Sequence, residues 1–403
     1  MFKQFKTITF VVLVGSLLLA ACSPAAPAPE QVEVTVMVEG KPETIIITAT
    51  PEPVEEKMAP GSVTLSGAGA TFPLPVYSDW TYAYQFVDPS VIITYNGIGS
   101  GGGKAGIIDR TIDFAGTDSL ISKEEYETGG DLQLLPVLAG AVVPIYNVTS
   151  LEKDAEGKSQ ALKGLVLDGE TLANIFMGNV QYWDDAAIQD LNPDLVGKLP
   201  NQRITVVHRS DKSGTTEIFT KGLSAFSQEW KDSFGGSSSI EWNDEATNGI
   251  GGKGNMGVAA AVQATPNSIG YVELSYAKEN KITFADMINV EGKRVQANAE
   301  SLQSAMAAFA DAFDENLGAN IVNAPGEASW PIVGYTYIII RLESMTDCVQ
   351  AQKLLEYINW TLTETAPAAR AAELGYATIP GPVLEKVQAK LNAVTCNGEP
   401  VLK

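Results

Sequence analysis

The chain has 403 residues, and its 48 Asp and Glu outnumber its 27 Lys and Arg, which gives a net charge of −21 at pH 7. Nucleic-acid binding relies on clustered basic side chains, so this acidic balance without a basic run excludes nucleic acid as an expected partner. One His and three Cys are too few for a common zinc or hydrolytic metal centre, and we expect no metal and no other cofactor.

The first 21 residues have the pattern of a secretory signal peptide. Lys3 and Lys6 precede an uncharged apolar run from Ile8 to Leu19, which is shorter than the about 20 residues that span a membrane. Leu-Ala-Ala-Cys at 19–22 resembles a bacterial lipobox, in which the cysteine thiol receives a diacylglycerol and becomes the first mature residue. We therefore expect Cys22 to anchor the protein by lipid to the cell membrane, in the periplasm or at the cell surface.

The other two cysteines can be paired by counting. With Cys22 used by lipid, Cys348 and Cys396 remain as an even pair in an oxidising compartment, which favours a disulfide between them. A shared metal is the alternative, but two distant thiols with a single His make a poor ligand set.

Residues 22–60 are rich in Pro, Ala, Glu and Thr and are expected to form a spacer between the lipid and the folded body. Within this spacer, every second residue from Val32 to Val38 is valine, and Ile45–Ile47 follow Gly40-Lys41-Pro42. This pattern favours a β-hairpin over 31–50. An apolar but disordered linker explains the same residues equally well, so both alternatives stay open.

From Ser62 onward, short β-branched runs alternate with segments of helical periodicity, which predicts βα units around largely parallel sheets. In each of three units a strand leads through a turn rich in glycine or hydroxyl residues into a helix. The strands are Val63–Leu65, Val91–Tyr95 and Ile204–Val207; the turns are 67–73, 97–103 and 209–216; the helices are marked by Tyr77, Trp80 and Tyr84, by Ile107 and Ile108, and by Phe219, Leu223, Phe226 and Trp230.

Each of these turns brings a helix N-terminus to the carboxyl end of a strand. Such termini bind anions through unpaired N–H groups and the positive end of the helix dipole. One such turn alone is typical of an ordinary loop, but three together, with hydroxyls at the helix starts, predict an anion site. Its donors would be the hydroxyls of Thr71, Ser100, Ser213 and Thr215, the backbone N–H groups of Phe72 and Gly214, and the guanidinium of Arg209.

Seven stretches of the chain carry a family resemblance. They are Gly-Ala-Gly-Ala-Thr-Phe-Pro at 67–73, Tyr-Asn-Gly-Ile-Gly-Ser-Gly-Gly at 95–102, Asp-Phe-Ala-Gly-Thr-Asp at 113–118, Leu-Asp-Gly-Glu-Thr-Leu at 167–172, Tyr-Trp-Asp-Asp at 182–185, Arg-Ser-Asp-Lys-Ser-Gly-Thr at 209–215 and Gly-Gly-Lys-Gly-Asn at 251–255. In this order they resemble the periplasmic phosphate-binding proteins of bacterial phosphate ABC importers, and the likeness runs from about residue 62 to about residue 390.

The resemblance implies an α/β fold of the two-lobed periplasmic-binding-protein kind (type II), with two doubly wound mixed sheets joined by a two-segment hinge. Lobe I would comprise residues 61–137 and 333–403, and lobe II residues 138–332, with crossings near Pro136–Val142 and Trp330–Gly334. The resemblance also implies a monomer that captures inorganic phosphate and hands it to the permease subunits of an ABC transporter.

The family's ligand contacts fall on matching positions of this chain. By the resemblance, Thr71, Ser100, Ser213 and Thr215 donate hydroxyls; Thr71, Phe72 and Gly214 donate backbone N–H groups; Arg209 pairs with phosphate oxygens and is oriented by Asp211. The chain departs from the family at Gly101, where relatives often have a second Ser.

Asp118 is expected to make the anion site selective for phosphate. By the resemblance it accepts a hydrogen bond from the proton that phosphate carries at neutral pH. Sulfate carries no such proton and would leave a desolvated charge facing it, so selectivity of about 10⁴ or more is expected. Outside this motif, an aspartate in this place would be typical of a turn or a helix cap.

Two alternatives remain open: a secreted phosphate-ester hydrolase or phosphotransferase on the same anion pocket, and a binder of another tetrahedral oxyanion such as sulfate or molybdate. A Walker loop is not supported, because neither Gly103-Lys104 nor Gly252-Lys253 is followed by Ser or Thr. There is no Gly-x-Ser-x-Gly elbow, and His208 is expected to be a packing or surface residue. We therefore expect a binding protein and not an enzyme.

Overall fold

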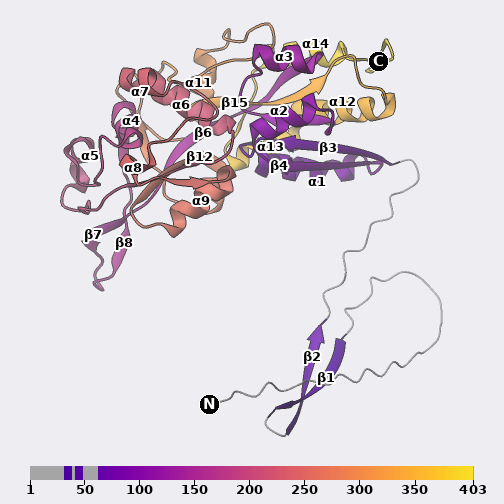
Figure 1. Ribbon diagram of the computed structural model, residues 1–403. Helices are drawn as coiled ribbons and strands as arrows, with labels where there is room; N and C mark the ends of the chain where they lie inside the picture. The colour runs from indigo at the N-terminus through magenta and orange to yellow at the C-terminus, as the bar shows by residue number, and fades with distance from the viewer. Residues whose placement is uncertain (1–30, 39–40, 49–61, 403) are drawn as a thin grey trace. The chain divides into compact units, whose positions relative to one another are not determined.

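The computed structural model describes residues 31–38, 41–48 and 62–402 (Figure 1). The chain divides into two compact units, Met1–Met58 and Ala59–Lys403, and each is described by itself. The predicted signal peptide and Cys22 lie outside the described residues.

In the N-terminal unit, strands β1 (Gln31–Val38) and β2 (Lys41–Thr48) pair antiparallel. Gln31 lies opposite Thr48, and Val38 lies opposite Lys41. Alternating β-branched residues on both sides of a short connection favour this pairing. Of the two alternatives for 31–50, the structure has the hairpin.

The second unit, the body, contains the remaining strands. They are β3 (Val63–Gly69), β4 (Val91–Gly97), β5 (Phe114–Thr117), β6 (Leu132–Asn147), β7 (Thr149–Lys153), β8 (Ser159–Ala161), β9 (Val166–Asp168), β10 (Thr205–Arg209), β11 (Ile250–Gly252), β12 (Ser268–Glu273), β13 (Asp286–Ile288), β14 (Arg294–Val295), β15 (Val333–Arg341), β16 (Ala377–Thr378), β17 (Thr395–Cys396) and β18 (Glu399–Pro400).

Helices connect most of these strands. They are α1 (Leu74–Val87), α2 (Ser100–Ile108), α3 (Lys123–Gly129), α4 (Gly169–Met177), α5 (Ala186–Leu191), the 3-10 helix η1 (Pro193–Leu195), α6 (Gly214–Phe226), α7 (Gln228–Ser233), α8 (Asp244–Thr247), α9 (Gly254–Ala264), α10 (Leu274–Glu279), α11 (Ala299–Ala308), α12 (Cys348–Thr363), α13 (Thr365–Leu374) and α14 (Gly381–Asn392). None of the helices in the described ranges is both long and apolar enough to cross a bilayer.

The main sheet has the strand order β11-β10-β12-β6-β15-β5-β3-β4, with β16 beside β6. In what we call the β10 half, β10 lies parallel to β11 and β12. In what we call the β3 half, β3 lies parallel to β4 and β5. Strand β15 completes the β3 half by pairing antiparallel with β5. Both halves are mixed, as predicted: β15 runs antiparallel to β5 in the β3 half, and β12 of the β10 half pairs antiparallel with β6.

Strand β6 is the element that the two halves share. It pairs with β15 as far as Ala141 and with β12 from Val142 onward. It is buried from Leu132 to Tyr146, which fits a strand covered on both faces. The predicted lobe boundaries at 137/138 and 332/333 lie near this change of partner and stay a prediction.

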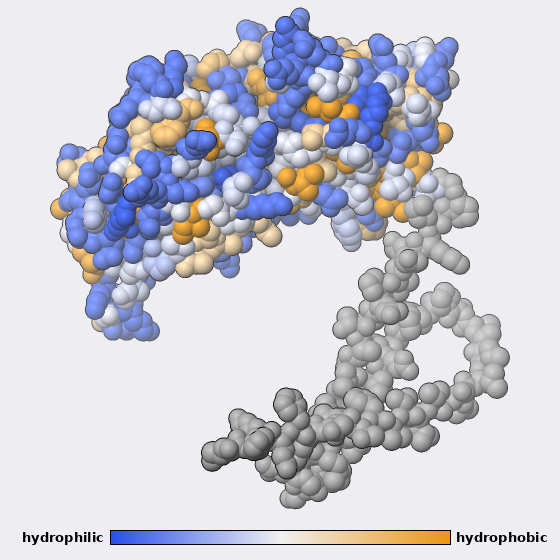
Figure 2. All heavy atoms as spheres, in the orientation of Figure 1, coloured by the Kyte–Doolittle hydropathy of each residue, from blue (hydrophilic) through white to orange (hydrophobic). Residues whose placement is uncertain are grey.

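Helices cover the sheet and close the core. In Figure 1, α1, α2 and α12 lie against the β3 half, while α6 and α9 lie against the β10 half. Four tryptophans are fully buried, and the visible face of the body is mainly hydrophilic with small hydrophobic patches (Figure 2). The buried tryptophans are Trp80, Trp183, Trp230 and Trp330.

Two helix boundaries differ from the sequence prediction. Helix α2 begins at Ser100 and includes Gly101–Gly103, which the sequence placed in the preceding turn. The single apolar helix face predicted from Phe219 to Trp230 is divided between α6 and α7. Ser227 separates the two helices, because its hydroxyl accepts the Trp230 N–H and caps α7.

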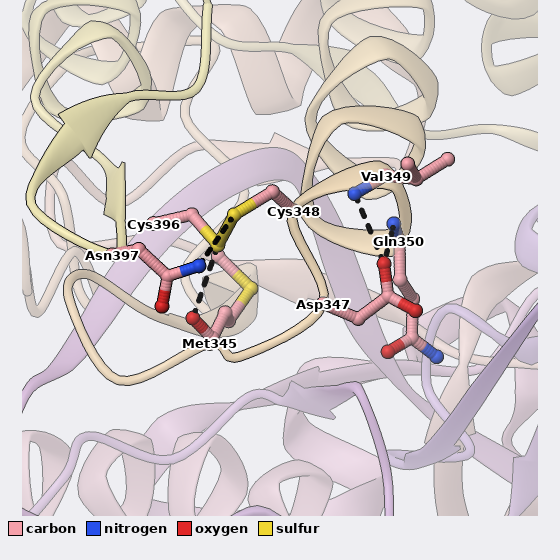
Figure 3. The surroundings of a disulfide bond; sticks show 7 residues. All are labelled: Met345, Asp347, Cys348, Val349, Gln350, Cys396 and Asn397. Atoms are coloured by element: carbon pink, nitrogen blue, oxygen red, sulfur yellow. Dashed lines mark hydrogen bonds between the residues drawn. A yellow bond between two sulfur atoms is a disulfide. The ribbon is translucent and has the colours of Figure 1, made fainter.

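The predicted disulfide between Cys348 and Cys396 is present (Figure 3). It joins the first residue of α12 to β17, with Cα atoms 5.5 Å apart. Beside it, Asp347 caps α12 by accepting the N–H groups of Val349 and Gln350, both at 3.0 Å. The bond therefore ties the C-terminal segment to the helix that packs on β3.

Replacing Cys348 and Cys396 together by Ser should lower the free energy of unfolding by about 4 kcal/mol, the loop-closure value for cysteines about 50 residues apart. Urea titration followed by tryptophan fluorescence measures this change. Reduced wild type is the matched control and should unfold at the same urea concentration as the double variant. An unchanged midpoint in both would contradict a stabilising bond.

Candidate anion-binding site

The three predicted turns lie at the carboxyl ends of parallel strands. Thr71 and Phe72 follow β3, Ser100 follows β4, and the loop from Arg209 to Gly214 leads from β10 into α6. Asp118 directly follows β5, the parallel neighbour of β3. Residues placed in this way gather at one edge of a sheet, which is where α/β folds bind ligands.

Ser100, Asp118 and Gly214 meet across the two halves. The Ser100 hydroxyl oxygen accepts the Gly214 N–H at 3.1 Å and the Asp118 N–H at 3.2 Å. A Cβ atom added to Gly214 would lie 2.5 Å from the Cβ of Asp118. Glycine at 214 is therefore what permits this close approach of α6 to the residue after β5.

Arg209 and Asp211 form a bidentate ion pair. Nε donates to Oδ1 at 2.8 Å, and Nη2 donates to Oδ2 at 2.6 Å. The guanidinium is almost fully buried, and its Nη1 donates to the Thr215 hydroxyl at 3.3 Å. Although burial raises the pKa of Asp211, the hydrogen bonds and charge of Arg209 outweigh it and hold that pKa below its usual value. The predicted orienting role of Asp211 fits this geometry.

Other side chains hold the Thr71-Phe72 turn through its carbonyl groups. The Tyr276 hydroxyl donates to the Thr71 carbonyl, and the Tyr376 hydroxyl donates to the Phe72 carbonyl at 2.7 Å. The Thr71 hydroxyl oxygen accepts the backbone N–H of Asn255 at 3.1 Å and its side-chain amide at 2.9 Å. The turn is therefore fixed by Tyr276 and Asn255, which follow strands of the β10 half, and by Tyr376 of the C-terminal segment.

Three of the predicted hydroxyls have both of their acceptor positions filled. Ser100 accepts two main-chain N–H groups, Thr71 accepts two N–H groups of Asn255, and Thr215 accepts from Arg209 and from the Asn255 amide at 3.1 Å. A hydroxyl oxygen has two lone pairs and one hydrogen. The hydrogens of Thr71 and Thr215 therefore point away from these donors, as an anion site requires, whereas the Ser100 hydroxyl donates to Asp118 Oδ2 at 3.4 Å.

Asp118 is a buried carboxyl group among these donors. Its Oδ1 accepts the Thr336 hydroxyl at 2.8 Å, and its Oδ2 lies 3.4 Å from the Ser100 hydroxyl. Burial raises the pKa of Asp118 to about 7, although the Thr336 hydrogen bond and the charge of Arg209 act in the opposite direction. The group can thus be ionised near neutral pH and accept a proton-bearing partner.

Ser213 is the N-cap residue of α6. Its hydroxyl caps α6 by accepting the Thr216 N–H at 3.1 Å, and among the hydrogen bonds of the described residues it makes none to another predicted site residue. Its hydrogen is still free to be donated.

Gly101, the departure from the family pattern, faces Lys212. A Cβ added to Gly101 would lie 2.6 Å from the Cβ of Lys212.

Sequence analysis missed the roles of Asn255 and Thr336. Asn255 belongs to the quoted stretch at 251–255, but nothing in that stretch indicates a contact with Thr71. Thr336 lies in strand β15 between Tyr335 and Tyr337, which are buried as well, so its hydroxyl did not stand out in the sequence. His208 is a packing residue, as predicted: it is buried, stacks on Trp242 and contacts Asp244 at 2.8 Å.

A second buried carboxyl group, Glu273, lies beneath the Thr71-Phe72 turn. Its Oε2 accepts the Ser275 N–H at 2.8 Å and lies 2.9 Å from the Tyr376 hydroxyl oxygen, while Oε1 has no hydrogen-bond partner among the described residues. Burial raises the pKa of Glu273 to about 8, although the bonds from Ser275 and Tyr376 act against it. Two carboxyl groups near the site therefore favour their neutral forms more than exposed ones do.

A mixed sheet shared by two halves, with a donor-rich site at the edge where they meet, defines the class of two-lobed substrate-binding proteins. A family model of the PBP superfamily domain matches residues 54–365. The phosphate-binding protein PstS of Xylella fastidiosa is 40% identical over 81% of this chain and 85% of its own length. PstS of Pasteurella multocida is 38% identical over 81% of this chain and 89% of its own length.

Among solved structures, a human phosphate binding apolipoprotein is similar, with a TM-score of 0.64 and 20% identity over 83% of this chain and 99% of its own. At this identity the likeness supports the fold alone. From the family model and the sequence relatives together, the chain belongs to the PBP superfamily and, within it, to the family of PstS phosphate-binding proteins.

The raised pKa values of Asp118 and Glu273 predict how stability depends on pH without ligand. A carboxyl group whose pKa is higher in the folded state holds its proton more tightly there, so stability falls as pH rises through the interval between the two values. That interval runs from 3.8 to about 7 for Asp118 and from 4.5 to about 8 for Glu273. The pKa of Asp131 is lowered to about 2, so the stability that this carboxylate contributes is constant over this range and is lost only at lower pH.

The melting temperature of the ligand-free protein should therefore fall between pH 5 and pH 8. The variants Asp118→Asn and Glu273→Gln should each flatten this dependence, because neither amide ionises. Scanning calorimetry at constant ionic strength measures the slope. A slope that both variants leave unchanged would contradict the burial of ionisable carboxyls at these positions.

Proposed function

We propose that this protein captures inorganic phosphate outside the cytoplasm and delivers it to the permease of an ABC transporter. The family to which the chain belongs supports phosphate as the ligand. The observation that carries the proposal is the set of hydroxyls with filled acceptor positions beside a buried carboxyl group. Such a set offers hydrogens to the oxygens of a tetrahedral anion and one acceptor to its proton.

Each site residue has a separate task in this proposal. The hydroxyls and the main-chain N–H groups bind phosphate oxygens, Arg209 neutralises charge while Asp211 holds it in place, and Asp118 accepts the ligand's hydrogen. Sulfate is rejected because its approach would bring two unprotonated oxyanions together at the buried Asp118. The donors are Thr71, Phe72, Ser100, Ser213, Gly214 and Thr215.

Binding is proposed to close a hinge between two lobes, residues 61–137 with 333–403 and residues 138–332. The ligand contacts both lobes, so it binds the closed state better and shifts the equilibrium toward it. Capture by closure requires no bond-breaking chemistry in this protein. His208, the chain's single His, is engaged by Trp242 and Asp244 and supplies no base for ester hydrolysis.

The N-terminal segment is proposed to place this body at the membrane. Residues 1–21 would be removed as a signal peptide, Cys22 would receive the lipid, and residues 22–60 would form the spacer. The body would act as a monomer on the extracytoplasmic side. These assignments rest on the lipobox at 19–22 and on the family.

Isothermal titration with phosphate and with sulfate tests the ligand. Wild type should bind phosphate about 10⁴ times more tightly than sulfate, because the latter cannot satisfy Asp118. Asp118→Asn should lower the ratio of phosphate affinity to sulfate affinity by a factor of at least about 100, because the Asn amide can also donate to an unprotonated sulfate oxygen.

Asp113→Asn is the matched control for this experiment. Asp113 lies just before β5 and accepts the N–H of Ser66 at 2.7 Å, away from the site. Its replacement should leave the ratio unchanged. Equal binding of both anions by wild type, or turnover of a chromogenic phosphate ester, would refute the proposed function.

Arg209→Lys should weaken phosphate binding by about 100-fold. An ammonium group cannot hold both oxygens of Asp211 and also reach the Thr215 hydroxyl in the planar geometry of a guanidinium. Titration with phosphate measures the loss. Arg370→Lys, at an exposed ion pair with Asp79, is the control and should bind as wild type does. Similar affinities for both variants would contradict the role of Arg209.

A further inference from the structure

Asn255 is the fully buried second residue of α9, and all of its side-chain hydrogen bonds reach outside that helix. Its amide nitrogen donates to the hydroxyls of Thr71 at 2.9 Å and Thr215 at 3.1 Å. Its amide oxygen accepts the Glu273 N–H at 2.9 Å. One side chain thus joins two predicted ligand hydroxyls, one from each half of the sheet.

The orientation of this amide follows from its surroundings. The oxygen and nitrogen of an Asn side chain are assigned from their partners, and a hydroxyl accepts either assignment. A backbone N–H, however, only donates. Because the Glu273 N–H faces one end of the amide, that end must be the oxygen, and the NH₂ group must face Thr71 and Thr215.

This orientation determines the direction of both hydroxyl hydrogens. Thr71 also accepts the Asn255 N–H at 3.1 Å, and Thr215 also accepts Arg209 Nη1 at 3.3 Å. With two donors on each oxygen, the hydrogens cannot point back toward Asn255 or Arg209. They point to the remaining side of each hydroxyl, where an anion oxygen can accept them.

The backbone around Asn255 is built for this contact. Gly254 has φ of +69°, which favours glycine, and an added Cβ would lie 3.3 Å from Thr71 Cγ2. Its N–H donates to Asp211 Oδ1 at 3.0 Å, the same oxygen that holds Arg209. The first two residues of α9 are therefore tied both to the Arg209 ion pair and to the Thr71 turn.

We propose that Asn255 is a positioning residue that fixes the hydroxyls of Thr71 and Thr215 as donors to the ligand and couples them across the closing cleft. The proposal rests on the phosphate function proposed above. Asn255 itself does not touch the ligand. Its amide prevents either hydroxyl from turning a lone pair toward the ligand. A lone pair in that position would repel the anion.

The first test compares Asn255→Ala in two backgrounds by titration with inorganic phosphate. In the wild-type background the substitution should weaken binding at least tenfold, because both hydroxyls regain rotational freedom. In a Thr71→Val background, where one of its targets is absent, the same substitution should cost clearly less. A residue that only supports α9 would cost the same factor in both backgrounds.

Asn255→Asp is the second variant, since it keeps the shape of the side chain. An ionised carboxylate accepts from the two hydroxyls and so turns their hydrogens away from the ligand. Phosphate binding should fall more than in Asn255→Ala. This variant also keeps the test decisive if the alanine variant does not fold.

Asn147→Ala is the matched structural control. Asn147 also donates two amide hydrogen bonds to α9, to the carbonyls of Val262 and Gln263 at the far end of the helix. Its loss should lower the melting temperature and leave the phosphate dissociation constant unchanged. Equal weakening by Asn147→Ala and Asn255→Ala would overturn the proposal.

The outcomes separate this proposal from the one on which it rests. If wild type binds no phosphate, the proposed function fails and the role of Asn255 fails with it. If wild type binds phosphate and Asn255→Ala or Asn255→Asp binds it equally well, only the role of Asn255 is refuted. Weakened binding with reduced cost in the Thr71→Val background supports both.

Discussion

The site depends on one constraint, which is that N–H groups occupy the lone pairs of its hydroxyls. At Ser100 these groups belong to the main chains of Asp118 and Gly214, so the hydroxyl cannot be turned by rotating a side chain. The main chain therefore determines in which direction this hydroxyl donates, and the fold determines where the main chain lies. Strands β5 and β10 and helices α2 and α6 must all be in position before Ser100 becomes a fixed donor.

The same arrangement has an energetic consequence for the carboxyl groups. A site that excludes water around donors also removes water from Asp118 and Glu273, and their ionisation becomes less favourable. Arg209 offsets part of this for Asp118, whereas Glu273 has hydroxyl and N–H partners only. Burial of these two carboxyl groups thus lowers the stability of the folded protein close to the site, as is common where function requires buried charge.

Much of this organisation could be predicted from the sequence, because local patterns carry it. Strand, turn and helix around Thr71, Ser100 and Gly214 follow from periodicity and turn chemistry, and the disulfide follows from counting cysteines. The roles of Asn255 and Thr336 could not be predicted, since their partners lie 184 and 218 residues away. The position of Ser213 is set locally instead, because its hydroxyl oxygen caps α6 and its hydrogen stays available to a ligand.

Strand β6 gives the body a mechanical property that two separately tethered domains would lack. Its hydrogen bonds run to β15 on one side of Ala141 and to β12 beyond it, so neither half can turn against the other without twisting this buried ribbon. At Gly140 the strand packs so closely on the Phe72 ring that an added Cβ would lie 2.5 Å from it, so β6 bears directly on the loop that begins at Thr71. Any turn of one half against the other would therefore have to deform the sheet at the point where it supports that loop.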